Sequence, residues 1–149
     1  MKSMFNKATR TEISRRIATL NRNKEPLWGA MNIYQMVKHC VLAERHYHGK
    51  LPVVAHERMD QADRKKLLAL VLAEGKPMIK NAHTADEFMV AETDGDFEAE
   101  ITRWLALISA YESFRPEKYM HWYFGPMSRT QLGQLSYKHN DHHLRQFGS

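Results

Sequence analysis

The sequence predicts an all-α fold, and two patterns carry that prediction. Apolar residues recur with the period of a helix from Phe97 to Tyr111, and this broad stripe predicts a helix over roughly 96–114. Two other segments begin with the pattern of a capping box, in which a polar residue is followed three positions later by a glutamine. We find no segment of useful length that alternates between apolar and polar residues as a half-buried strand would.

Shorter apolar stripes predict two further helices, over about 9–20 and about 60–74. Gly75, with a proline close behind it, is the expected end of the second. The stretch from 76 to 95 is polar and mixed, so we interpret it as a long connection. The residues that mark the two stripes are Ile13, Ile17, Leu20, Leu67, Leu70 and Val71.

The two capping boxes predict helices that begin after Asn32 and after Ser128. In each, the cap side chain can accept from a backbone N–H, and Gln35 or Gln131 can reach back to the cap. The apolar residues that flank each cap fit a hydrophobic staple. Both starts follow an aromatic residue and a glycine. We interpret this similarity as two helices that begin in the same way for the same structural reason. An ancient internal repeat is the alternative.

The composition is that of a globular protein, with 149 residues, 43% of them hydrophobic and 26% charged. This length predicts one domain over 1–149. No apolar run approaches the length of a membrane span. The first twenty or so residues lack the apolar core of a secretory signal. Cys40 is the single cysteine, which excludes an internal disulfide. We therefore expect a cytoplasmic protein.

The formal charge of +5 raises the question of an anionic partner. The basic residues are spread along the chain from Lys2 to Arg145, with no block of five or six. No nucleic-acid motif accompanies them. We interpret them mainly as solvated faces and regard a nucleic-acid partner as unlikely. An anionic small molecule is the remaining alternative.

The last predicted helix carries histidines on its inward face. At about 100° per residue, His139 and His143 each fall within about 20° of Leu132, so they continue the apolar stripe. They are one helical turn apart, which lets both imidazoles reach one metal ion. His142 lies at the edge of that face. Satisfied core histidines are the alternative, but burying several without partners is costly.

A third ligand is needed, and the residues alone leave its identity open. His39 lies on the shoulder of the apolar stripe of the helix after Asn32, and His46 lies one heptad further on. His121 and Cys40 are the other candidates, although the central position of Cys40 in the stripe suits a small buried hydrophobe. Glu44 also falls on the inward side. It is expected to be a ligand, a partner that orients a histidine, or half of a buried ion pair.

Three motifs resemble those of the DinB-like superfamily of metal-binding proteins. They are Trp28-Gly29-x-Met31-Asn32-x-x-Gln35-Met36-x-x-His39-Cys40, Phe124-Gly125, and His139-x-x-His142-His143-x-x-Gln146-Phe147-Gly148. The resemblance implies an up-and-down four-helix bundle, here with a short additional helix in the long connection. It also implies a frequent homodimer.

The resemblance further implies one divalent metal ion, held by His39, His139 and His143. Zinc or nickel is the expected metal, with iron or manganese as alternatives. Nearby residues are expected to line the pocket or support the ligands. These are His142, Gln35, Glu44, Trp28, Tyr137 and Gln146.

Several relatives in this superfamily are transferases that use a low-molecular-weight thiol. The resemblance therefore suggests a metal-dependent thiol S-transferase acting on small electrophiles. A non-catalytic stress-related protein that binds a metal or a small ligand is the alternative. A metal-dependent hydrolase and a nucleic-acid-associated module are less favoured.

Overall fold

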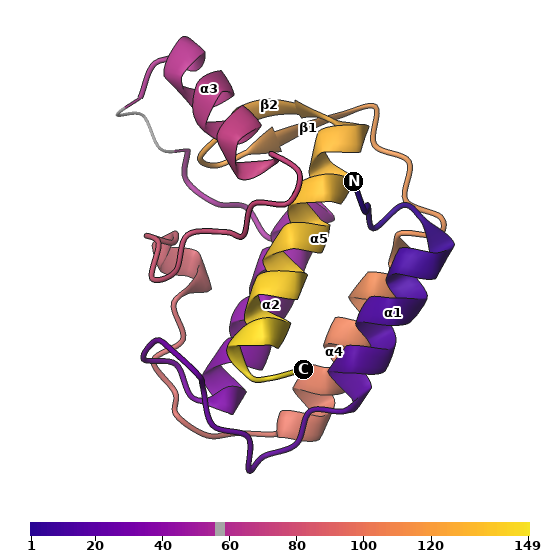
Figure 1. Cartoon of the computed structure of the whole chain (residues 1–149), viewed down its shortest axis with the longest axis vertical. Coiled ribbons are helices and arrows are strands. Elements are labelled where there is room, and N and C mark those ends of the chain that lie inside the picture. The colour runs from indigo at the N-terminus through magenta and orange to yellow at the C-terminus, as the bar shows by residue number, and fades with distance from the viewer. Residues whose placement is uncertain (56–58) are drawn as a thin grey trace.

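The computed structural model describes residues 1–55 and 59–149, and its main body is a bundle of four helices (Figure 1). In this bundle α1 and α2 each pack against both α4 and α5. The buried core between them is mainly aliphatic and aromatic, with Trp104 and Leu144 fully buried. The four helices are α1 (Lys7–Ala18), α2 (Ile33–Tyr47), α4 (Phe97–Ala110) and α5 (Arg129–Gln146).

The four helices run in two directions. The side chain of Asn32, at the start of α2, donates to the carbonyl of Thr93 just before α4, so α2 and α4 begin at the same end of the bundle. Arg16 in α1 donates to Ser149 just beyond α5, so these two helices end together. The chain reverses its direction between α1 and α2 and again between α4 and α5. Helices α2 and α4 run the same way, because the long segment between them brings the chain back to the end at which α2 begins.

The predicted helices are confirmed, with small shifts at their ends. Both capping boxes are present, at Asn32 with Gln35 and at Ser128 with Gln131. The glycine that follows the aromatic residue has a positive φ before each of these helices, at Gly29 (φ +83°) before α2 and at Gly125 (φ +73°) before α5. In this region of φ only glycine avoids a steric cost.

The cap of α5 gives a direct test of helix stability. Ser128 Oγ accepts from the backbone N–H of Gln131 at 3.2 Å. Replacing Ser128 with alanine leaves that N–H without its acceptor, so we expect a loss of about 0.5–2 kcal/mol in the free energy of unfolding. Urea denaturation measures it, with Ser113→Ala outside any capping box as the control. An unchanged unfolding midpoint for Ser128→Ala would show that the cap contributes nothing.

The segment between α2 and α4, which includes the connection predicted at 76–95, carries the additional helix, α3 (Gln61–Val71), and a 3₁₀ turn at Asp86–Phe88. The helix ends one turn before the predicted stop at Gly75. The physical reason is the buried side chain of Lys138, whose Nζ donates to the carbonyls of Val71, Ala73 and Lys76 at 2.6–2.8 Å. Lys138 thus supplies a donor to carbonyls at the helix end, where a longer helix would supply backbone N–H groups.

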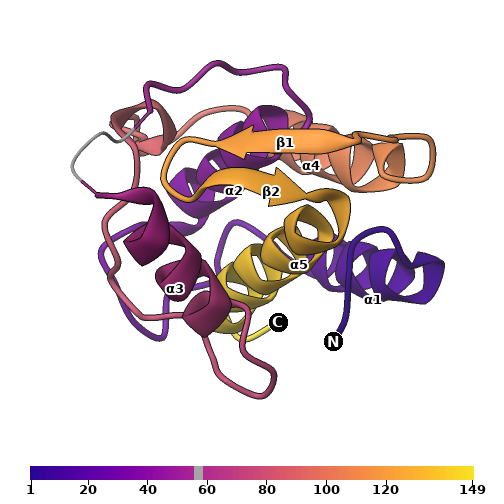
Figure 2. The ribbon, with the colours of Figure 1, turned by 90° about the horizontal axis from the view of Figure 1, so that it is seen from above.

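The fold is mostly helical, as predicted, with the addition of a short hairpin that the sequence did not predict. Its strands, β1 (Lys118–His121) and β2 (Gly125–Ser128), pair antiparallel with His121 opposite Gly125. It lies with α3 at one end of the bundle (Figures 1 and 2). In the described part of the chain, no helix is long and apolar enough to cross a membrane.

Candidate metal centre

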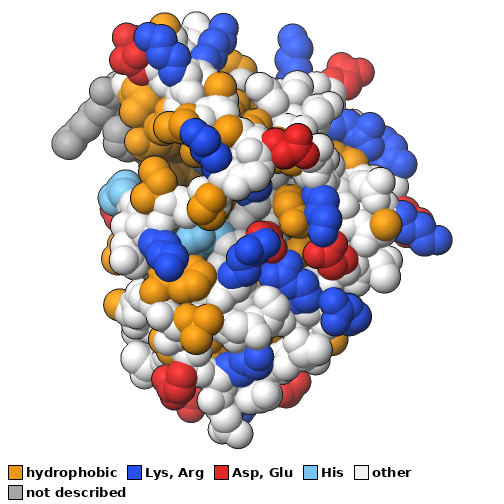
Figure 3. Space-filling model, viewed as in Figure 1, with side chains coloured by type: hydrophobic (Ala, Val, Ile, Leu, Met, Phe, Trp, Pro, Cys, Tyr) orange, Lys and Arg blue, Asp and Glu red, His pale blue; other side chains and the backbone are white. Residues whose placement is uncertain are grey.

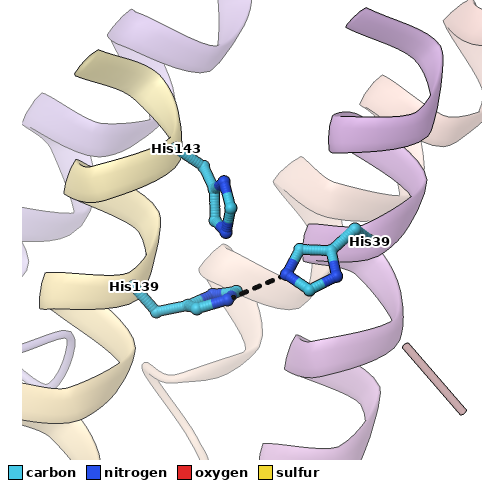
Figure 4. Close-up of side chains that lie close together, drawn as sticks. All are labelled: His39, His139 and His143. Atoms are coloured by element: carbon cyan, nitrogen blue, oxygen red, sulfur yellow. Dashed lines mark hydrogen bonds between the residues drawn. The ribbon is translucent and has the colours of Figure 1, made fainter. Parts of the chain in front are cut away.

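Three histidine side chains from two helices converge between α2 and α5. One ring nitrogen from each of His39, His139 and His143 lies within 4.8 Å of the others. The closest pair is His39 Nε2 and His139 Nε2, at 3.1 Å. Figure 4 shows the three rings directed into the same space, with His39 on one side and the two histidines of α5 on the other. The one-turn spacing of His139 and His143 therefore places both beside the same point.

Hydrogen bonds at the far side of two rings fix which nitrogen faces the centre. His39 Nδ1 donates to the backbone carbonyl of Phe88 at 3.0 Å. His143 Nδ1 donates to Oε1 of Gln146 at 2.9 Å, and Gln146 in turn donates to the carbonyl of Trp28. A neutral imidazole has one N–H, so these bonds leave Nε2 of His39 and of His143 with a free lone pair. Such outer hydrogen bonds are what orients metal-ligating histidines.

The three histidines are held in the neutral form that binds metals. Burial lowers the pKa of His39, and it lowers the pKa of His139 and of His143 well below the usual range. The neighbouring rings add to the last two shifts, because bringing one proton into the cluster disfavours a second. Nitrogen lone pairs therefore stay available at a pH where free imidazoles begin to protonate.

The residues present fit a divalent ion. Two nitrogens bound tetrahedrally at about 2.0–2.1 Å from one zinc ion lie roughly 3.3 Å apart. The observed 3.1 Å between His39 Nε2 and His139 Nε2 is close to this spacing. The triad can therefore hold a metal ion through side chains that already face one another.

Glu44 lies in the bundle core and takes none of the three roles expected of it. Its carboxylate accepts from Tyr111 at 2.8 Å and from Ser136 and Asn140 at 2.6 Å each. Asn140 also accepts from the indole N–H of Trp104 at 2.8 Å. Burial raises the pKa of Glu44, while these donors oppose the rise. Glu44 thus ties α2, α4 and α5 together instead of binding the metal.

The other rival ligands also lie outside the triad. Cys40 is fully buried and contacts Met36, as a small core residue does. His46 donates from Nδ1 to the carbonyl of Leu51, and His121 accepts two backbone N–H groups through Nδ1. Among the described residues, the cluster of potential ligands therefore consists of three histidines, with no carboxylate or thiol in it.

Some of the expected pocket residues lie near the triad. The backbone carbonyl of Trp28 accepts from Gln146, which holds His143. The ring centres of Trp28 and His142 are 5.7 Å apart. His142 is half-buried beside His143. Lys80 Nζ lies 4.2 Å from the Trp28 ring centre. Figure 3 shows histidine among hydrophobic and basic side chains on the face that carries α5.

Two expected pocket residues lie elsewhere. Tyr137 packs on the core shared with α1, and Lys2 lies over its ring, so the contacts observed for Tyr137 are with that core and not with the triad. Gln35 contacts the triad only indirectly, because its amide donates to the carbonyl of Val90, near the Phe88 carbonyl that holds His39. The sequence could not reveal Phe88 as a supporting residue, since every residue has a carbonyl.

The buried histidines predict a specific pH dependence of stability. Burial, with His46 nearby, lowers the pKa of His121 to about 3. The unfolded chain binds a proton below a pH of about 6.5 while the folded chain does not, so acid favours unfolding. This one histidine should cost about 2 kcal/mol between about pH 7.5 and about pH 5.

Urea unfolding of the metal-free protein at both pH values measures this effect. The variant His121→Asn keeps an oxygen that can accept from Tyr123 and Phe124, so the fold should be retained. We expect its stability to depend less on pH by about 2 kcal/mol over that interval. The same pH dependence in both proteins would contradict the assignment.

Comparison with known proteins identifies the family of this fold. The model of the DinB superfamily (DinB_2) matches residues 7–147, which span all four bundle helices and the three histidines. Comparisons with curated proteins and with solved structures give no match. The four-helix bundle with its buried histidine triad is therefore a DinB fold, and the chain belongs to the DinB superfamily.

Proposed function

We propose that this protein is a metal-dependent enzyme that activates a small thiol for transfer to an electrophile, with zinc or nickel held by His39, His139 and His143. The observation that carries the proposal is the composition of the cluster, which offers three neutral imidazoles and no fourth side-chain ligand among the described residues. Catalytic metal sites typically have three protein ligands and one open position, whereas structural sites are closed.

The chemistry of the donors favours an anionic ligand at that position. Imidazole nitrogens are neutral, so a bound ion keeps its charge, and it supplies a positive field that stabilises a thiolate. Glu44 is directed to Tyr111, Ser136 and Asn140, so it does not neutralise that field at close range. The chain's own contribution is to hold the rings of His39 and His143 in place through Phe88 and Gln146.

The surroundings of the cluster favour a small and partly apolar molecule. The rings of Phe88, Tyr47 and Trp28 lie close to the triad or to its neighbour His142. Lys80 at the Trp28 ring adds a positive charge at the outer side of the site. In the overall reaction a carbon–sulfur bond forms, the leaving group departs with the bonding electrons, and the thiol proton is released.

The test uses the visible spectrum of the cobalt-substituted protein. We expect 2-mercaptoethanol to change the spectrum, and we expect His39→Ala to abolish the response. His142→Ala should keep it, since His142 is outside the cluster of ligands. Turnover of 1-chloro-2,4-dinitrobenzene with the same thiol then tests for catalysis. A spectrum that thiols leave unchanged would indicate a structural metal and a non-catalytic protein.

A further inference from the structure

A second cluster of three polar rings lies beside the metal centre. It consists of His46 from α2 and Tyr119 and His121 from β1. The ring centres are 5.6 Å apart for His46 and Tyr119, 5.7 Å for His46 and His121, and 6.2 Å for Tyr119 and His121. Both histidines are more than nine-tenths buried, with exposed fractions of 6% and 5%. We call these three residues the polar subsite.

Two buried polar atoms of the polar subsite have no hydrogen-bond partner among the described residues. His46 donates from Nδ1 to the carbonyl of Leu51 at 3.0 Å, so its Nε2 is an acceptor. That Nε2 is buried and has no hydrogen-bond partner among the described residues, and the same is true of the Tyr119 hydroxyl. His121 accepts two backbone N–H groups at Nδ1, so its Nε2 carries a proton and is a donor.

Such groups are rarely left unpaired, because a buried polar atom without a partner costs about 1–3 kcal/mol. A hydroxyl group satisfies both unpartnered atoms at once, since it can donate to His46 Nε2 and accept from Tyr119. A carboxylate fits less well, because it has no proton to donate to His46. The charges that act on the subsite are also acidic, with Glu87 acting on His46 and Glu44 on Tyr119. An uncharged hydroxyl is therefore the best match.

Two aromatic side chains contact both the polar subsite and the metal centre. The centre of the Tyr47 ring lies 6.1 Å from that of His139 and 6.0 Å from that of His121, on which it stacks. The centre of the Phe88 ring lies 6.3 Å from that of His39 and 5.6 Å from that of His46. Each of these two aromatic side chains thus contacts both clusters, so the metal centre and the polar subsite are neighbours in the fold.

We propose that His46 and Tyr119, with His121 beside them, bind a hydroxyl group of the molecule whose thiol lies at the metal centre. This inference rests on the function proposed above and specifies its thiol as a hydroxylated one. His46, which the sequence offered as an alternative metal ligand, then positions the substrate. The subsite would favour a thiol that carries a hydroxyl group over a plain alkanethiol.

The test measures the affinity of the cobalt-substituted protein for matched pairs of thiols. The hydroxythiols 2-mercaptoethanol, 3-mercaptopropanol and 4-mercaptobutanol are each compared with the alkanethiol that has a methyl group in place of the hydroxyl. We expect at least one hydroxythiol to bind about tenfold more tightly than its partner, as one additional hydrogen bond predicts. This preference should vanish in Tyr119→Phe and in His46→Leu. It should persist in Tyr34→Phe, a buried tyrosine of α2 outside the subsite.

Equal affinities within every pair would overturn the subsite, and so would a preference that survives Tyr119→Phe. Those results would mean that ordered water alone fills the cluster. If no thiol changes the cobalt spectrum, the proposed function fails, and the subsite is decided separately. In that case 1-butanol is added to ¹⁵N-histidine-labelled protein. A shift of the His46 Nε2 signal that is absent in Tyr119→Phe supports the subsite, and an unchanged signal rejects it.

Discussion

Replacing either His139 or His143 with alanine should nearly abolish metal binding, while His142→Ala should weaken it far less. The first two offer ring nitrogens to one cluster with His39, whereas His142 stands beside it. Losing one of three ligands should reduce affinity by more than the roughly 10–100-fold that loss of a supporting residue costs. Competition with a chromophoric chelator measures the affinity for zinc.

His142→Ala is a closely matched control, because His142 neighbours His143 on α5 and is half-buried. Its ring contacts both His143 and Trp28, so a modest loss is expected. Equal losses in all three variants would contradict the assignment of ligands. Full zinc occupancy in the His139→Ala/His143→Ala double variant would contradict it as well.

Replacing Asn140 with leucine should destabilise the fold by about 3–5 kcal/mol. The Asn140 amide donates to Glu44 and accepts from Trp104, and all three side chains are buried. Leucine is of similar size but leaves a buried carboxylate and a buried indole N–H without these partners. The free energy of unfolding from urea denaturation checks this expectation.

Ser136→Ala provides a graded comparison within the same network. It removes one of the donors to Glu44 and leaves Asn140 and Tyr111 in place, so the loss should be smaller. An exposed change on α4, Thr102→Ala, should stay within about 0.5 kcal/mol of the original protein. If Asn140→Leu destabilises no more than Thr102→Ala, then the buried network does not stabilise the bundle.

The helices could be predicted from the sequence because their signals are local. The box at Ser128 and Gln131 fixes where α5 begins, and the one-turn spacing of His139 and His143 fixes that they share a face. The resemblance to DinB-like proteins was needed to choose His39. On α2 alone, His39 and His46 lie on the same shoulder, and in the structure His39 is the one that meets His139 and His143 of α5.

The features that escaped prediction depend on contacts between distant segments. The hairpin strands have four residues each, too few for alternation to be recognised, and β2 contains a glycine and a proline. Glu44 was expected to bind the metal, to orient a histidine or to form a buried ion pair, but its partners are Tyr111 at the end of α4 and Ser136 and Asn140 of α5. Homodimerisation, which the resemblance implies, stays a prediction that sedimentation in solution would test.

The central claim is that His39, His139 and His143 together hold one divalent metal ion. Elemental analysis of protein purified without an affinity tag or added metal tests it most directly. We predict about one ion of zinc or nickel per chain, and almost none in the His139→Ala/His143→Ala double variant purified in the same way. Protein that is folded and carries no divalent metal, or a double variant that carries as much as the original chain, would contradict the claim.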